Sequence, residues 1–186
     1  MEIYLVRHTT PDVPKGTCYG QSDLPLAMGY QKDLAQTQSL LPEKLGAVYS
    51  SPLLRCKTLA WELEGEINFD ARLKELNFGD WELKKWEDIP KEQLNPWMES
   101  YVELAPPKGE SYLQLAERVK AFWNELLEKE LDTVAIISHG GVIRALLSII
   151  LDLDLKNSFK LQIDYGSVSQ VSINQKQITI QYINKV

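Results

Sequence analysis

The chain contains only two histidines, and each one follows a run of apolar residues that is typical of a buried strand. Arg7 and His8 come after the run in residues 2–6, and His139 comes just after the run in 133–137. In open α/β sheets, ligands bind beyond the carboxyl ends of the strands. The sequence therefore predicts that both imidazoles and the Arg7 guanidinium lie at one edge of a sheet.

Residues of these types suit the transfer of a phosphoryl group. The planar guanidinium groups of Arg7 and Arg55, the latter expected in the first turns of a helix, can neutralise phosphate oxygens through paired hydrogen bonds. Gly140 is expected to open a helix, where backbone N–H groups favour an anion. A neutral His8 can attack phosphorus and form a covalent N–P bond, while His139 as an imidazolium would bond to the same oxygens.

A leaving alkoxide needs a proton, and we expect Glu75, which follows a short apolar segment at 67–69, to supply it. A bound phosphate dianion would raise the pKa of this carboxyl group by like-charge repulsion, which keeps its proton available. After the transfer, the same carboxylate could activate water. Each of these residues alone is commonly a surface, capping or ion-pair residue, so the prediction depends on their coincidence at four strand ends.

The pattern around these residues predicts strands that alternate with helices. Strands are expected at 2–7, 47–49, 67–69, 133–137, 168–173 and 178–182, and helices at 29–41, 52–64, 91–102, 110–130 and 142–151. Ser51 is expected to cap the second helix, with Pro52 in its first position. This alternation predicts one α/β domain over 1–186, a three-layer α/β/α sandwich with a mostly parallel sheet and an antiparallel edge strand. Residues 77–108 are expected to form a lid-like insertion over the active site.

The bulk composition limits the partners and the compartment. A formal charge of −6 argues against a nucleic-acid or anionic-membrane partner, but a small phosphate monoester fits if arginines converge locally. Cys18 and Cys56 form no zinc-binding pattern and are expected to be reduced packing residues, as in the cytoplasm. Neither a metal nor another cofactor is expected. The sequence leaves the oligomeric state open, a homodimer included.

Four segments match, in order, the motifs of a known family: residues 5–8 (LVRH), 50–55 (SSPLLR), 73–82 (LKELNFGDWE) and 138–141 (SHGG). The chain resembles the histidine phosphatase superfamily, in the branch that includes the cofactor-dependent phosphoglycerate mutases. The resemblance implies a phosphoglycerate mutase-like fold. It also implies the site: His8 as phosphoacceptor, Glu75 as proton donor, and Arg7, Arg55 and His139 as the phosphate pocket.

Within that family, segments 16–26, 78–82 and 106–111 resemble the phosphatases of α-ribazole 5′-phosphate, which serve cobalamin nucleotide-loop assembly. This implies that the substrate is hydrolysed to α-ribazole and phosphate. The residues expected to bind the substrate or its phosphate are Thr9, Gln21, Trp81 and Gly140. The chain also departs from the family pattern, because Thr9 and Pro14 stand where the family commonly has Gly and Asn.

Two alternatives remain open from the sequence. The first keeps the enzyme class but changes the substrate, as in a broad-specificity phosphatase, a sugar-phosphate phosphatase or a weak phosphoglycerate mutase. The second is a catalytically silent module that binds phosphate or a phosphoprotein. Binding alone requires neither a nucleophile nor a proton donor, so the presence of both His8 and Glu75 favours an enzyme.

Overall fold

A six-stranded sheet forms the middle layer of the computed structural model, which describes residues 1–175 and 177–186. The strands are β1 (Glu2–Arg7), β2 (Ala47–Ser50), β3 (Glu66–Phe69), β4 (Thr133–Ser138), β5 (Val168–Asn174) and β6 (Gln177–Lys185). Their order is β3-β2-β4-β1-β5-β6. The first four are mutually parallel, whereas β5 runs antiparallel to β1 and β6 antiparallel to β5. The mostly parallel α/β sheet is thus confirmed, with an antiparallel pair at one edge.

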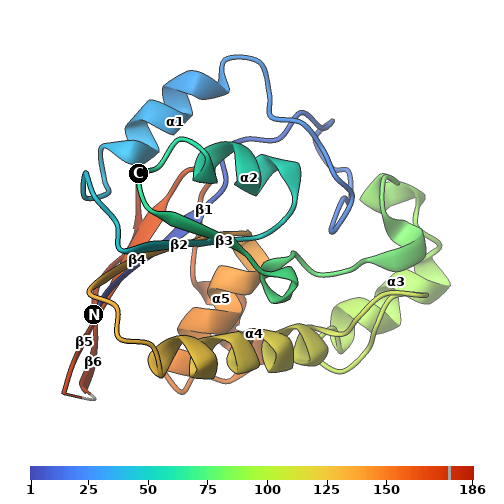
Figure 1. Ribbon diagram of the computed structural model, residues 1–186. Coiled ribbons are helices and arrows are strands. Elements are labelled where there is room, and N and C mark those ends of the chain that lie inside the picture. The colour runs from blue at the N-terminus through green and yellow to red at the C-terminus, as the bar shows by residue number, and fades with distance from the viewer. Residues whose placement is uncertain (176) are drawn as a thin grey trace.

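Helices cover both faces of this sheet (Figure 1). Helices α1 (Tyr30–Gln38) and α2 (Leu54–Ala60) lie on one face, and α4 (Tyr112–Leu127) and α5 (Gly140–Ile150) lie on the other. Because successive side chains of a strand point to opposite faces, Ile3 and Leu5 pack in the core beneath α4 and α5. Val6 packs in the second core, beneath α1 and α2. The three-layer sandwich expected from the sequence is therefore present.

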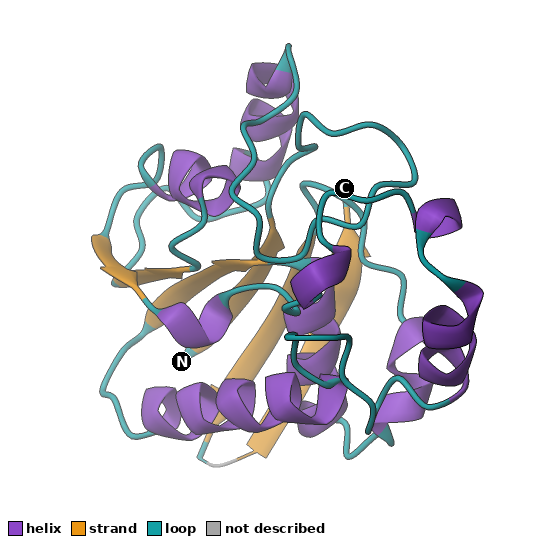
Figure 2. Ribbon diagram, turned by 90° about the vertical axis from the view of Figure 1, so that its right-hand side faces the viewer, coloured by secondary structure: helices purple, strands orange, loops and turns teal. Residues whose placement is uncertain are grey.

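The remaining helix, α3 (Lys91–Glu99), belongs to segment 77–108 and lies beyond the carboxyl ends of the parallel strands (Figure 1). Figure 2 looks onto that side of the molecule and shows loops in front of the strand ends. Trp81, which the sequence assigned to substrate binding, lies in a small buried cluster with Cys18 and Ile89. Its indole N–H donates to Gln93 Oε1 at 3.1 Å.

Several helix boundaries expected from the sequence were wrong. The second helix begins after Leu53 rather than at Pro52 and ends at Ala60 rather than Glu64, and Ser51 is not its N-cap. The boundaries of the first, third, fourth and fifth helices differ from the expected ones by at most three residues. Helix α4 begins with a capping box instead, in which Ser111 Oγ accepts from the Gln114 backbone N–H. In the described part of the chain, no helix has the length and apolarity that crossing a membrane requires.

Candidate active site

The structure brings the two histidines side by side at the carboxyl edge of the sheet. Strands β1 and β4 pair in register, with Arg7 opposite Ser138, so the residues that follow each strand end are neighbours. The backbone N–H of His8 donates to Ser138 O at 3.0 Å. The ring centroids of His8 and His139 are 5.0 Å apart. Both side chains are buried, and His8 is only 1% exposed.

The hydrogen bond of the His8 ring fixes its tautomer. Nδ1 lies 2.7 Å from the carbonyl oxygen of Thr9, and because a carbonyl only accepts, Nδ1 is the donor. Burial holds the pKa of His8 well below its usual range, and the nearby Arg55 and Arg7 lower this pKa further. The imidazole is therefore neutral, with its unshared electron pair on Nε2, which is the form that a nucleophile needs.

His139 stands at the N-cap position of α5 and contacts the end of β2. Its Nε2 lies 2.8 Å from Ser51 Oγ and 3.5 Å from Cys56 Sγ. Burial, followed by the nearby His8 and Arg55, holds the pKa of His139 well below its usual range. The imidazolium expected from the sequence thus requires a bound anion, whose charge would raise this pKa again.

Both arginines are held by backbone carbonyl groups. Arg55, fully buried in the first turn of α2, donates from Nη1 to Ser22 O at 2.8 Å and from Nη2 to Gly20 O at 2.6 Å. Arg7 donates from Nη1 to Ile163 O at 2.5 Å. Among the described residues, neither guanidinium lies within salt-bridge distance of a carboxylate. Their charges are therefore left uncompensated.

Three further polar atoms at this place are buried but have no hydrogen-bond partner among residues 1–175 and 177–186. They are Nε of Arg7, Nε of Arg55 and Oγ1 of Thr9. A buried donor without a partner costs about 1–3 kcal/mol. Two uncompensated guanidinium charges together with unpartnered donors are what an oxyanion such as phosphate satisfies.

The Glu75 carboxylate sits against the start of α5. Oε1 accepts from the Leu76 backbone N–H at 2.9 Å, and Oε2 accepts from the Gly141 N–H at 3.1 Å. A Cβ atom on Gly141 would overlap Glu75 Oε1, so only glycine allows this approach. A Cβ atom on Gly140, the first residue of α5, would come within 3.0 Å of Arg144 Nη1 and 3.4 Å of Arg7 Cζ, so this glycine leaves room mainly for Arg144.

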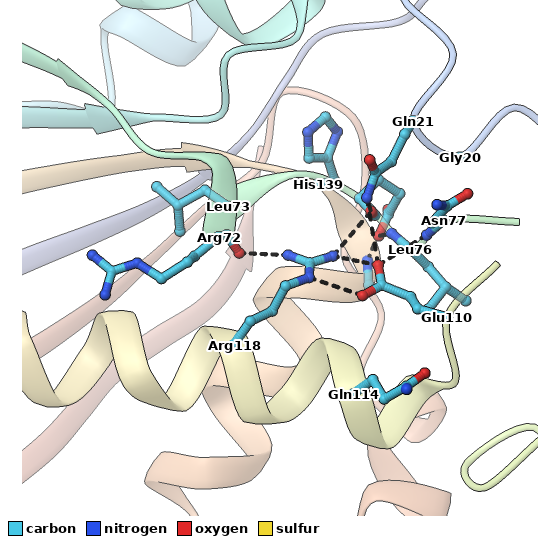
Figure 3. Close-up of polar contacts among 12 residues, drawn as sticks. Gly20, Gln21, Arg72, Leu73, Leu76, Asn77, Glu110, Gln114, Arg118 and His139 are labelled. Carbon is cyan, nitrogen blue, oxygen red and sulfur yellow. Dashed lines mark hydrogen bonds and ion pairs between the residues drawn. The ribbon is translucent and has the colours of Figure 1, made fainter. Parts of the chain in front are cut away.

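A network of polar side chains fixes the backbone of residues 72–77 (Figure 3). Arg118, from α4, donates from Nη2 to the Glu75 carbonyl oxygen at 3.0 Å and to Glu110 Oε1 at 2.7 Å. Glu110 Oε1 also accepts from the Asn77 N–H at 3.0 Å. Gln21, expected to bind substrate, donates from Nε2 to the Glu75 carbonyl oxygen at 3.0 Å. Sequence reasoning assigned no role to Arg118, because a charged residue on an amphipathic helix usually belongs to its solvated face.

Two adjoining cavities open beside these residues. The smaller, of about 130 Å³, is lined by polar and apolar groups: Arg7, Glu75, Leu76, Phe78, Tyr112, Gly140, Gly141, Arg144 and Phe159. The larger, of about 440 Å³, is lined by Leu76, Phe78, Trp86, Trp97, Met98, Tyr101, Tyr112 and Phe159. They share Leu76, Phe78, Tyr112 and Phe159, so the apolar cavity continues the polar one. A phosphate ester can therefore place its ester oxygen near Glu75 and an apolar group among the aromatic rings.

No three potential metal ligands (His, Cys, Asp or Glu) gather at one place within residues 1–175 and 177–186. Both cysteines are buried free thiols, as expected. Burial raises the pKa of Cys18 to about 12 and also raises that of Cys56, so both remain protonated at neutral pH.

Comparison with known proteins decides the family. The sequence model of the histidine phosphatase superfamily (branch 1) matches residues 3–186. The chain belongs to this family. The family supports a phosphatase reaction, and its members share the phosphoglycerate mutase-like fold seen here.

The known relatives of this histidine phosphatase are named for different substrates. It is 28% identical over 197 residues to the adenosylcobalamin/alpha-ribazole phosphatase of Escherichia coli, covering 99% of this chain and 96% of that protein. It is 27% identical over 194 residues to phosphoserine phosphatase 1 of Hydrogenobacter thermophilus, covering 99% and 92%. The crystal structure of the alpha-ribazole phosphatase from Shigella flexneri superposes with a TM-score of 0.90 at 25% identity, covering 100% of this chain and 96% of that one.

Proposed function

We propose that this histidine phosphatase is a phosphomonoesterase that works through a phosphohistidine on His8, and that its substrate is α-ribazole 5′-phosphate. The observation that carries the proposal is the continuity of the two cavities. The smaller one is lined by the Arg7 guanidinium and the Glu75 carboxylate. Behind it lies the buried, neutral imidazole of His8, whose pKa the nearby Arg55 and Arg7 lower. The other offers aromatic walls to the leaving group.

In the first step, Nε2 of His8 attacks phosphorus, the N–P bond forms and the bond from phosphorus to the ester oxygen breaks. Arg7 and Arg55 neutralise the phosphoryl oxygens, and His139 donates to them once the bound dianion has raised its pKa. Glu75 gives its proton to the departing oxygen. The chain is then a phosphohistidine with an ionised Glu75.

In the second step, water attacks the phosphorus of the phosphohistidine. Glu75 takes the proton from this water, the N–P bond breaks and its electron pair returns to Nε2. Phosphate leaves, and the neutral His8 with a protonated Glu75 is restored. The hydrogen bond from Nδ1 of His8 to the Thr9 carbonyl supports both steps, because it keeps the same ring nitrogen available throughout.

The apolar cavity supports a substrate whose leaving group carries a planar, weakly polar ring, such as the benzimidazole of α-ribazole. Residues 77–108 supply Phe78, Trp86, Trp97, Met98 and Tyr101 to its walls. The rings of Trp86 and Trp97 are stacked, with centroids 5.9 Å apart and an interplanar angle of 24°. We propose that this segment acts as the lid expected from the sequence and binds the base by stacking, which contributes about 1–3 kcal/mol per base.

A panel of phosphate esters tests the substrate proposal. The value of kcat/KM for α-ribazole 5′-phosphate is expected to exceed that for ribose 5-phosphate by about 5- to 150-fold, the factor equivalent to one stacked base. Trp97→Ala should remove most of this preference. The matched control is Trp61→Ala, since Trp61 is 59% exposed and packs on Phe69 outside both cavities. Equal rates on both esters, or an equal effect of both tryptophan variants, would contradict the substrate assignment.

One observation favours a second candidate, a small phosphate ester with a carboxylate such as phosphoserine. Arg144 lines the polar cavity, donates from Nε to Leu161 O at 2.9 Å, and is in no salt bridge within the described residues. Its free guanidinium edge could bind a second anionic group. Under this alternative, Arg144→Gln would raise KM for phosphoserine at least tenfold more than KM for α-ribazole 5′-phosphate.

His8→Ala tests the reaction itself. The variant should lose turnover of every ester but still bind inorganic phosphate, because both arginines remain. Acid-labile phosphate trapped on the wild-type chain and absent from His8→Ala would support the intermediate. Retained turnover would remove His8 as the nucleophile, and a wild-type chain that binds phosphate without any turnover would favour the silent binding module.

A further inference from the structure

Two tyrosines that the sequence analysis did not single out cover the arginines of the site. The hydroxyl oxygens of Tyr19 and Tyr165 are 2.6 Å apart and share a hydrogen bond. The Tyr165 ring lies over Arg7, whose guanidinium carbon is 3.7 Å from the ring centroid. The ring centroids of Tyr165 and His8 are 5.5 Å apart. The Tyr19 ring lies over Arg55, whose guanidinium carbon is 5.3 Å from the ring centroid.

Each tyrosine belongs to the loop that holds its own arginine. Tyr19 precedes Gly20 and Ser22, whose carbonyl oxygens accept from Arg55. The same loop is closed by the hydrogen bond from the Ser22 N–H to Tyr19 O at 2.8 Å. The position of the Arg55 guanidinium therefore depends on the conformation of residues 19–22.

Tyr165 has the same relation to Arg7. The carbonyl of Ile163 accepts from the Arg7 side chain, and the N–H of Gly166 donates to the Arg7 carbonyl at 3.2 Å. The two loops come from distant parts of the chain, since Tyr19 and Tyr165 are 146 positions apart. The phenol–phenol hydrogen bond is thus a direct link between the two arginine-holding loops.

Such a link has a physical purpose. Arg7 and Arg55 carry like charges and repel one another. Without the tyrosines, only hydrogen bonds to uncharged carbonyl groups would hold the two guanidinium groups in place. Aromatic faces attract guanidinium groups, so the two rings, fixed to one another, hold both cations. Burial and the hydrogen bond to Tyr165 raise the pKa of Tyr19, so the phenol keeps its proton for this bond at neutral pH.

We propose that Tyr19 and Tyr165 are positioning residues, a tyrosine bridge that sets the spacing of Arg7 and Arg55 for the phosphoryl group. The bridge rests on the proposed function, because it acts on the phosphate through the two arginines.

A double-mutant cycle tests the bridge. Tyr19→Phe and Tyr165→Phe each keep the ring over its arginine but remove the shared hydrogen bond. Titration calorimetry with inorganic phosphate should show binding about 2- to 10-fold weaker in each single variant, the factor equivalent to one hydrogen bond. The double variant should bind no more weakly than either single one, because both changes break the same bond. Steady-state kinetics should show the same factor in KM, with kcat nearly unchanged.

Tyr182→Phe, on β6, is the matched control and should leave phosphate binding and KM unchanged. Tyr165→Leu, which also removes the ring from Arg7, should weaken binding more than Tyr165→Phe. Unaltered binding in both single Phe variants, losses that multiply in the double variant, or a change in kcat alone would overturn the bridge. His8→Ala separates the two ideas: if it is inactive while the Phe variants behave as wild type, the bridge fails and the phosphohistidine proposal stands.

Discussion

Replacing Gly141 by Ala should displace the side chain of Glu75, the proposed acid, while leaving residue 75 itself unchanged. Gly141 is the second residue of α5, and its N–H holds one oxygen of the Glu75 carboxylate. The added methyl group would overlap the other oxygen, Oε1. Since this oxygen is the end of a flexible side chain, the carboxylate can move away at little cost, but it then leaves its place beside the cavity.

The expected loss is large for one class of substrate and small for another. General acid catalysis contributes about 10²- to 10⁴-fold to a rate, so kcat for an alkyl phosphate, whose alkoxide must be protonated, should fall by about that factor in Gly141→Ala. p-Nitrophenyl phosphate, whose leaving group departs as a stable anion, should lose about tenfold or less. Folding should not suffer, because alanine is favoured over glycine inside a helix by up to about 1 kcal/mol.

Steady-state kinetics on both esters, together with thermal unfolding, checks this expectation. Gly140→Ala is the matched comparison, because its methyl group would meet Arg144 Nη1 at 3.0 Å and Arg7 Cζ at 3.4 Å rather than Glu75. It should affect both esters alike. In the double variant Gly141→Ala/Glu75→Gln, the loss should equal that of Glu75→Gln alone. Multiplying losses, or a Gly141→Ala variant that hydrolyses both esters normally, would refute the argument.

Three further predictions follow from burial and hydrogen bonding. The pKa values of His8 and His139 are lowered in the folded chain, so the unfolded chain binds more protons there. The free energy of unfolding should therefore fall as the pH drops below about 6.5, by up to about 1.4 kcal/mol per pH unit for each histidine, and thermal unfolding of His139→Asn should show a shallower pH slope. Arg118→Met removes the ion pair with Glu110, in which the two side chains are only 20% and 17% exposed, and should lower the free energy of unfolding in urea by about 2–3 kcal/mol. The matched variant Arg72→Met breaks more exposed pairs, with Asp70 and Glu125, and should lower it by about 1 kcal/mol or less. Ser111→Ala removes the capping box of α4 and should cost about 1 kcal/mol in the same assay, whereas no loss would mean that the cap contributes little.

The sequence could predict the sheet and the residues at its strand ends because both depend on local patterns. Apolar runs identify β1 and β4, and a residue that directly follows a strand is placed by the strand itself. This is why His8 and His139 could be expected at one edge before any pairing was known. The Tyr19–Tyr165 bond and the Arg118–Glu75 contact could not be predicted, since each depends on how distant segments fold over one another.

Ser51 shows how a tertiary contact overrides a local signal. Serine followed by proline is a common helix start, yet α2 begins only at Leu54. The Ser51 hydroxyl lies 2.8 Å from Nε2 of His139, 88 positions away, and its oxygen accepts from the Leu53 N–H at 3.3 Å. The serine therefore lies in the site, and the helix begins two residues later than expected, with Arg55 in its first turn.

The choice of partners for the arginines explains how a chain with a net charge of −6 can still attract a phosphate ester. Arg7, Arg55 and Arg144 donate to backbone carbonyl oxygens, and none is in a salt bridge within the described residues. A carboxylate partner would compensate a buried guanidinium better than a carbonyl does. It would also compete with the substrate for the same N–H groups. Carbonyl groups fix the direction of each guanidinium and leave its charge available to an anion. Binding of an anion to the folded protein should therefore raise the free energy of unfolding.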